Sequence, residues 1–229
     1  MRLAVIQHAM RPAPAQDLEA LLVAAARAAE SGAEVIVIPG VPALDEGPLA
    51  EDLWRRLEET APGITTIAAG CEEPDDGCGG TVEVAPLGRV LTLTGDVCIE
   101  PGALAAFAKG APDVAVLAPR SESELQAQAV FELAIGLSTS LAPLVVIAEP
   151  DGAEIGDPGH GGSAVVYLGE VLGEAMSGDD LLLVDIVLPI APPEPRDSIP
   201  LVPPVLAQRV GALGRGHLRQ SQIIGPPCR

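Results

Sequence analysis

Aromatic and basic residues are scarce in this sequence. Trp, Tyr and Phe together make up 2% of the 229 residues, and Lys109 is the only lysine. With 13 Lys and Arg against 32 Asp and Glu, the formal net charge is −19. This balance excludes the basic surface that binding to nucleic acid or anionic lipid requires. The scarcity of aromatic residues predicts a core of Ala, Val, Leu and Ile, as in a sheet covered by alanine-faced helices.

Signals for several other classes of protein are also missing. The first eight residues do not form a signal peptide, and Pro143 interrupts the longest apolar stretch, residues 133–148. No G-x-G-x-x-G motif follows the first predicted strand, so an ordinary dinucleotide site is not expected. We therefore expect a cytoplasmic protein that does not bind a membrane, nucleic acid or a cofactor.

The four cysteines are too few for a disulfide framework in a chain of this length. Cys71 and Cys78 flank an acidic loop, which suggests a metal site. However, no histidine is nearby and the spacing is not that of a zinc knuckle. A loop with incidental thiols is the favoured interpretation, and no metal is expected.

The N-terminal segment has the pattern of a parallel strand–helix–strand unit. Residues 2–8 and 33–39 are short apolar runs rich in β-branched residues, which is typical of buried strands. Between them, residues 17–31 place leucines and alanines on one helical face, and Gly32 ends the helix as its C′ residue. The crossover is expected to be right-handed.

The rest of the chain continues with strands and helices. Strands are predicted at residues 64–69, 81–85, 89–94, 113–118, 144–148, 163–168, 171–174 and 181–187, and helices at 49–60, 101–110 and 121–141. The last helix is expected to begin with a capping box formed by Ser121 and Glu124. Its buried stripe is predicted to contain Leu125, Ala129 and Leu133.

Parallel crossovers and antiparallel hairpins occur together in this order of elements. They predict an α/β fold, a four-layer α-β-β-α sandwich, over residues 1–188. Residues 189–229 are rich in proline, so they predict an extended C-terminal tail.

A strand, a sharp turn and a helix organise residues 88–101. The strand stops at Gly95 and Asp96, and a helix is predicted to begin at Pro101. Such an arrangement presents a nucleophile or an anion site at the carboxyl edge of a sheet. We expect Thr94, Gly95 and Asp96 to form a tight turn in which Gly95 takes a positive φ or admits a close backbone contact.

This order of elements resembles the nitrilase, or carbon–nitrogen hydrolase, superfamily over nearly the whole chain. The resemblance rests on seven segments that follow one another as in that family: residues 3–7, 28–39, 113–119, 144–149, 161–163, 167–172 and 181–186. Each segment is a weak signal alone, but seven in the right order are specific. The resemblance implies the layered fold predicted above.

Members of that superfamily hydrolyse amides or nitriles with a Glu, a Lys and a Cys. The resemblance places the Glu at Gly40 and the Cys at Thr94 or Gly95, and no lysine lies between Gly40 and Thr94. This chain is therefore similar to a degenerate member in which all three catalytic residue types are absent from their places. We expect no amidase or nitrilase turnover on this basis.

Cys98 is the candidate for a relocated nucleophile, since it lies in the loop after the predicted strand. A small buried thiol beneath the loop is the favoured interpretation. The candidates for lining a pocket follow predicted strands or form the turn: Glu72, Glu73, Thr94, Gly95, Asp96 and Glu149. The default interpretation of the three glutamates is that they are ordinary loop acids.

The favoured hypothesis is a catalytically inactive nitrilase-fold protein, a pseudoenzyme that serves as a binding or assembly component. One alternative is an amide hydrolase that uses Cys98 as a relocated nucleophile. The other is a non-catalytic protein that binds a small molecule. A two-fold homodimer is also expected, because the helix at 121–141 carries Val130, Phe131 and Ile135 in addition to its sheet-facing stripe.

Overall fold

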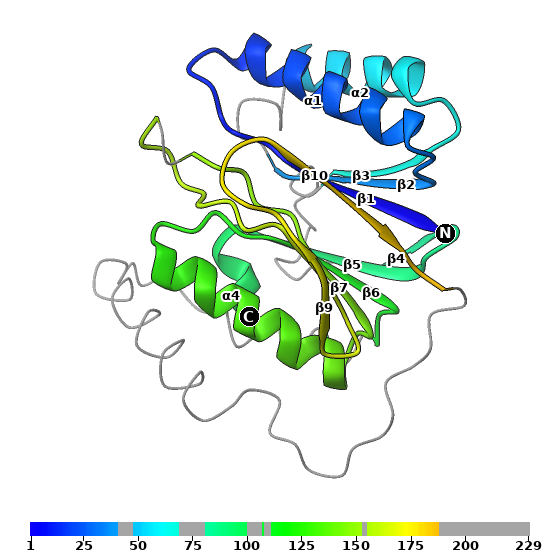
Figure 1. Cartoon of the computed structure of the whole chain (residues 1–229), viewed down its shortest axis with the longest axis vertical. Helices are drawn as coiled ribbons and strands as arrows, with labels where there is room; N and C mark the ends of the chain where they lie inside the picture. Colours follow the sequence, from blue (N-terminus) through cyan, green and yellow to red (C-terminus); the bar gives the residue numbers. More distant parts are fainter. Residues whose placement is uncertain (41–47, 69–80, 100–106, 108–110, 153–154, 188–229) are drawn as a thin grey trace, which may run out of the picture.

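Two sheets and three longer helices make up the computed structural model (Figure 1), which describes residues 1–40, 48–68, 81–99, 107, 111–152 and 155–187. The predicted helix at residues 101–110, apart from Phe107, lies outside the described residues. The predicted proline-rich tail, residues 189–229, also lies outside them.

The first sheet has four strands in the order β10-β1-β2-β3. The strands β1 (Arg2–Gln7), β2 (Val35–Ile38) and β3 (Thr65–Ala68) are parallel, and β10 (Asp180–Asp185) runs antiparallel to β1. The helices α1 (Pro14–Glu30) and α2 (Pro48–Thr60) follow β1 and β2 and cover one face of this sheet (Figure 1). Every residue of β2 is buried, as expected for a continuous apolar run covered on both faces.

The second sheet has six strands in the order β4-β5-β6-β7-β8-β9. These are β4 (Thr81–Val84), β5 (Gly88–Thr94), β6 (Val114–Ala118), β7 (Leu144–Ile147), β8 (Ala164–Tyr167) and β9 (Glu170–Glu174). The central strands β5, β6 and β7 are parallel, and the two predicted hairpins, β4–β5 and β8–β9, are antiparallel. The helix α4 (Glu124–Ser140) covers the outer face of the sheet.

The sheets pack face to face between the helices, which gives four layers (Figure 1). Side chains from both sheets, including Val5, Val116 and Val146, form the core between them. A second core joins the first sheet to α1 and α2, and a third joins the second sheet to α4. Ala25 and Ala28 of α1 have no exposed surface, so this helix can approach its sheet closely. The predicted α-β-β-α sandwich is confirmed.

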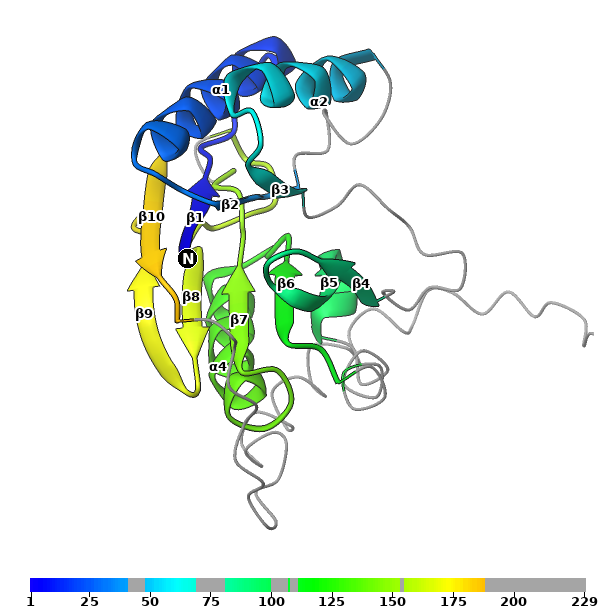
Figure 2. The same ribbon diagram turned by 90° about the vertical axis from the view of Figure 1, so that its right-hand side faces the viewer.

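The chain returns from the second sheet to the first through the connection between β9 and β10. These two edge strands lie next to each other (Figure 2). The connection, residues 175–179, therefore reaches the carboxyl end of β1, where Gln7 pairs with Asp180.

The C-terminal end of α1 lies where the sequence predicts it. Gly32 has a φ of 79°, and its N–H donates a hydrogen bond to the carbonyl oxygen of Ala29 at 2.9 Å. A residue with a Cβ is disfavoured in this left-handed conformation, which is why glycine is common at C′. The predicted helix end is confirmed.

The predicted capping box of α4 is wrong by two residues. The N-cap is Ser123, whose side chain accepts a hydrogen bond from the N–H of Gln126 at 3.3 Å. The predicted cap, Ser121, is fully buried, and its N–H donates to Glu149 Oε1 at 2.9 Å. A tertiary contact therefore holds Ser121 outside the helix.

The apolar surface of α4 also differs from the prediction. Leu125, expected in the buried stripe, is 49% exposed, whereas Val130 is almost completely buried against the sheet. Phe131 and Ile135 are partly buried against the same core. The surplus of apolar surface that predicted a dimer is consequently smaller than expected, because Val130 belongs to the core of the domain.

Candidate functional site at the carboxyl ends of the strands

The parallel strands of both sheets end on the same side of the sandwich. Ala9, after β1, forms a parallel bridge with Asp151, after β7, and this bridge fixes the relative direction of the two sheets. Gly40, Thr94 and Glu149 lie at or after the ends of β2, β5 and β7, so all three belong to this side. Ligands bind at such an edge in open α/β sheets. We call it the elbow end.

The predicted turn after β5 is confirmed. Gly95 has a φ of 58°, and it begins a short 3₁₀ helix, η2 (Gly95–Ile99). A Cβ placed on Gly95 would meet no atom within 4 Å. The glycine is therefore required by its backbone conformation and not by a close contact.

Thr94 and Cys98 lie on opposite faces of the second sheet. Because side chains alternate along a strand, Thr94 shares the face of Val90, which packs between the two sheets. Cys98 packs in the core on the α4 side, where it is 1% exposed, and its Sγ donates to the carbonyl oxygen of Leu93 at 3.2 Å. The structure thus separates the position implied for the nucleophile from the nearest thiol.

The acid at this end of the second sheet is Glu149, which is 1% exposed. Its Oε1 accepts hydrogen bonds from the N–H groups of Ser121, at 2.9 Å, and His160, at 3.2 Å. Burial raises the pKa of the Glu149 carboxyl above its ordinary value, although the hydrogen bonds from Ser121 and His160 act in the opposite direction.

Glu149 and Thr94 are not brought into one catalytic cluster. β6 lies between β5 and β7, so the ends of their strands are separated by two strand spacings, roughly 10 Å. Gly40 is buried at the end of the first sheet and carries no side chain that could move a proton. Glu149 instead links the segment before α4 to the loop before β8, through its bonds with Ser121 and His160.

Gln7 joins the two sheets at the elbow end. Its Oε1 accepts a hydrogen bond from the N–H of Ser163 at 2.8 Å, and its Nε2 donates to the carbonyl oxygens of Gly178, at 3.0 Å, and Met176. Ser163 in turn exchanges hydrogen bonds with the backbone of Glu149. The sequence pointed to Gln7 only through the family resemblance, which says nothing about these partners.

A buried pair of His8 and Asp17 lies beside Gln7, and no sequence motif predicts it. His8 Nε2 is 2.6 Å from Asp17 Oδ1, and both side chains are nearly inaccessible to solvent. Burial lowers the pKa of His8, against the opposing effect of the hydrogen bond to Asp17. The geometry fits a tautomer in which Nε2–H donates to Asp17 and Nδ1 accepts from Arg11.

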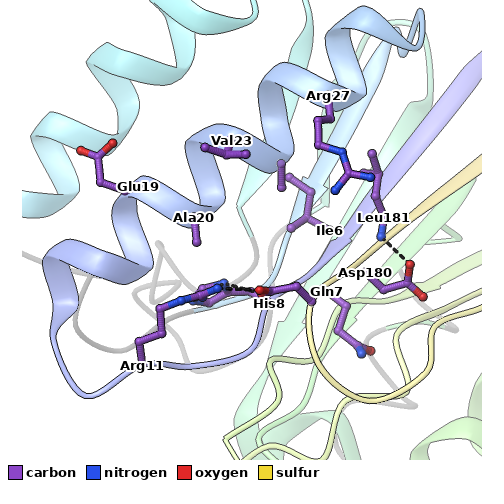
Figure 3. Close-up of a pocket in the computed structure, with 12 residues that line it drawn as sticks. Ile6, Gln7, His8, Arg11, Glu19, Ala20, Val23, Arg27, Asp180 and Leu181 are labelled. Carbon is purple, nitrogen blue, oxygen red and sulfur yellow. Dashed lines mark hydrogen bonds and ion pairs between the residues drawn. The ribbon is translucent and has the colours of Figure 1, made fainter.

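Arg11 completes this cluster from the loop after β1. Its Nη1 lies 3.1 Å from His8 Nδ1, and its Nη2 donates to Asp179 Oδ2 at 2.5 Å. His8 and Arg11 line one end of a pocket between α1 and the start of β10 (Figure 3). The polar groups around β1 thus hold one another in place.

Not every predicted site residue can be placed. Glu72 and Glu73 lie outside the described residues, and the side chain of Asp96 is not described. Among the described residues, no group of three or more His, Cys, Asp and Glu side chains could hold a metal ion. None of the helices in these residues is both long enough and hydrophobic enough to cross a bilayer.

Comparison with known proteins identifies the fold. No protein-family model matches the chain, and no curated protein sequence does. Solved structures of an amidase from Nesterenkonia sp. AN1, which belongs to the nitrilase superfamily, are similar in fold. One of them has a TM-score of 0.64 at 20% identity, covering 94% of this chain and 99% of the amidase. At this identity the likeness establishes the nitrilase fold.

Two further structures of that amidase contain small amides. In one, with a TM-score of 0.65 and 20% identity over 81% of this chain and 90% of the amidase, the acetamide moiety of fluoroacetamide is covalently attached to the active-site cysteine. In the other, a cysteine variant is in complex with butyramide, with a TM-score of 0.64 and 20% identity over 95% and 97% of the two chains.

Proposed function

We propose that this chain hydrolyses small amides at the elbow end, with Cys98 as its nucleophile. The observation that supports this most strongly is the likeness, over 94% of the chain, to an amidase. A further structure of that amidase shows an active-site cysteine. Cys98 is the one cysteine among the described residues, and it lies four residues after the end of β5. The alternative predicted from the sequence is therefore better supported than the pseudoenzyme hypothesis.

The proposed reaction is a two-step acyl transfer. The sulfur of Cys98 forms a bond to the amide carbon, the carbon–nitrogen bond breaks, and the thiol proton leaves with the departing amine. Water then adds to the thioester, which releases the carboxylic acid and restores the thiol. The thiol must first become accessible, because Cys98 lies within η2 and is 1% exposed, with its side chain packed in the core on the α4 side. A movement of this turn is therefore part of the proposal.

The second candidate is a protein that binds small amides and does not hydrolyse them. The hydrogen bond from Cys98 Sγ to the carbonyl oxygen of Leu93 favours it, because this thiol faces the core on the α4 side. The glycine at position 40 also favours it, since no carboxylate stands there to move a proton.

Turnover of an amide panel separates these candidates. Acetamide, butyramide and acrylamide should each release ammonia with the wild-type protein and release none above background with Cys98→Ala. The control variant is Cys98→Ser, which keeps the size of the side chain, and the melting temperature of each variant shows that it is folded. If turnover is absent while butyramide still raises the melting temperature, binding without hydrolysis is the function.

We also propose a two-fold homodimer. The exposed side chain of Leu125 and the exposed parts of Phe131 and Ile135 give α4 an apolar outer surface. Because a net charge of −19 opposes association, the dimer should strengthen as salt screens the repulsion. Light scattering that reports a monomer at moderate salt, for the full chain and for a chain ending at residue 188, would exclude it.

A further inference from the structure

A pocket of about 330 Å³ lies between α1 and the start of β10, outside the core between the two sheets (Figure 3). Its volume is at the lower end of the range for small-molecule sites. Apolar side chains form much of its wall: Ile6, Ala20, Val23, Ala24 and Leu181. Val23 is 60% exposed, so the pocket offers apolar surface that no other element of the described chain covers.

The carboxylates in the wall are already engaged. Glu19 accepts two hydrogen bonds from Arg56 on α2, at 2.5 and 3.1 Å. Asp179 accepts from Arg11, and Asp180 accepts from a backbone N–H of its own strand at 2.8 Å. Glu19 and Asp179 are thus paired with arginines, whereas both oxygens of Asp180 accept backbone N–H groups.

The two arginines of the wall differ. Arg11 is engaged through both Nη atoms, with His8 and Ala9 on one side and Asp179 on the other. Arg27 reaches from α1 toward Leu181 (Figure 3), and within the described chain its guanidinium has no hydrogen-bond or ion-pair partner. Arg27 is therefore the basic side chain of this pocket that has no partner within the described residues.

We propose that this pocket binds a short aliphatic carboxylate. The carboxylate would accept paired hydrogen bonds from the Arg27 guanidinium, whose planar fork matches a carboxylate. The alkyl chain would lie along α1, against Val23 and Ala24, with Leu181 on the opposite wall. The site is separate from the elbow end and does not depend on hydrolysis there.

Titration calorimetry with hexanoate tests the proposal directly. Hexanoate should bind the wild-type protein, whereas 1-hexanol and hexylammonium, which have the same chain with a neutral or a positive head, should bind at least roughly tenfold more weakly. Equal binding of hexylammonium, or no heat with hexanoate, would overturn the assignment.

Two variants remove the proposed contact in different ways. Arg27→Gln removes the charge, and Val23→Glu places a carboxylate four residues before Arg27, where it can pair with the guanidinium along the helix. Both should lose hexanoate binding by roughly tenfold or more. The matched controls change charge equally at exposed positions elsewhere: Arg55→Gln on α2 and Val82→Glu on β4. Both controls should bind hexanoate like the wild type.

The same variants test whether Arg27 has only a structural role. A basic residue in the last turn of α1 interacts favourably with the helix dipole, so Arg27→Gln is expected to lower the melting temperature slightly. If hexanoate raises the melting temperature of Arg27→Gln as much as that of Arg55→Gln, Arg27 has only this structural role and the proposal is wrong.

Discussion

β1 and β5 reach the elbow end in different ways. At the end of β1, Gln7 and His8 are buried and form hydrogen bonds with groups from several other segments. At the end of β5, Thr94 is half-buried, Gly95 turns the chain, and Cys98 lies beneath the turn. The first end is held by side chains, and the second by backbone conformation. The fold thus forms the turn after β5 from backbone conformation, with Gly95 at a positive φ.

The largest effect is expected from breaking the cluster at β1. Asp17→Ala removes the acceptor of the buried His8 Nε2 and of the partly buried Arg11 N–H. The free energy of unfolding, measured by urea denaturation, should fall by roughly 1–3 kcal/mol for each donor left without a partner. Glu19→Ala removes a carboxylate from the same helix, but it pairs with Arg56 at the surface, so its effect should be much smaller. Similar losses in the two variants would show that the buried cluster is not what holds β1.

A smaller loss is expected at the turn of β5. Gly95→Val places a β-branched residue at a φ of 58°, which should lower the free energy of unfolding by roughly 1–3 kcal/mol. Gly95→Asn is the control, because asparagine tolerates the left-handed region better, and it should cost less. Equal stability of all three proteins would mean that Gly95 is not held at a positive φ in solution.

The sequence predicted the strands and the turn better than the polar clusters. Runs such as residues 35–38 and 114–118 identify buried strands from their composition alone, and Gly32 and Gly95 mark the places where φ is positive. These signals are local, so a single sequence contains them. The amphipathic pattern of α4 predicts its buried face less accurately, since Leu125 is exposed and Val130 is buried.

The polar clusters depend on contacts between distant segments. Ser121 and Ser123 each begin a pattern that can cap a helix, and only the hydrogen bond from Ser121 to Glu149, 28 residues away, decides between them. His8 contacts Asp17 because the chain reverses between β1 and α1, and no sequence motif predicts this contact. Cys98 was correctly expected to be a buried thiol, because a small apolar side chain after a strand usually packs beneath the following turn.

The smallest effect concerns Glu149 and depends on pH. Burial raises its pKa in the folded protein above the unfolded value of about 4.3, so its contribution to stability is present below that pH. This contribution is lost as the pH rises through the folded pKa. Glu149→Gln cannot ionise, so its stability should rise relative to that of the wild type as the pH increases from 4 to 8. The exposed Glu174 gives a control with the same change in charge, and Glu174→Gln should show no such gain. A constant difference between Glu149→Gln and wild type at both pH values would contradict the assignment.

Covalent labelling of the native protein with fluoroacetamide tests the central claim most directly. If Cys98 is the nucleophile of an amide hydrolase, the intact mass should rise by one acetamide group, and peptide mapping should place this group on Cys98. Cys98→Ala should remain unlabelled under the same conditions. Labelling that occurs only after unfolding, or only on Cys71, Cys78 or Cys228, would contradict the account. The turn after β5 would then be the remnant of an elbow that performs no amide chemistry.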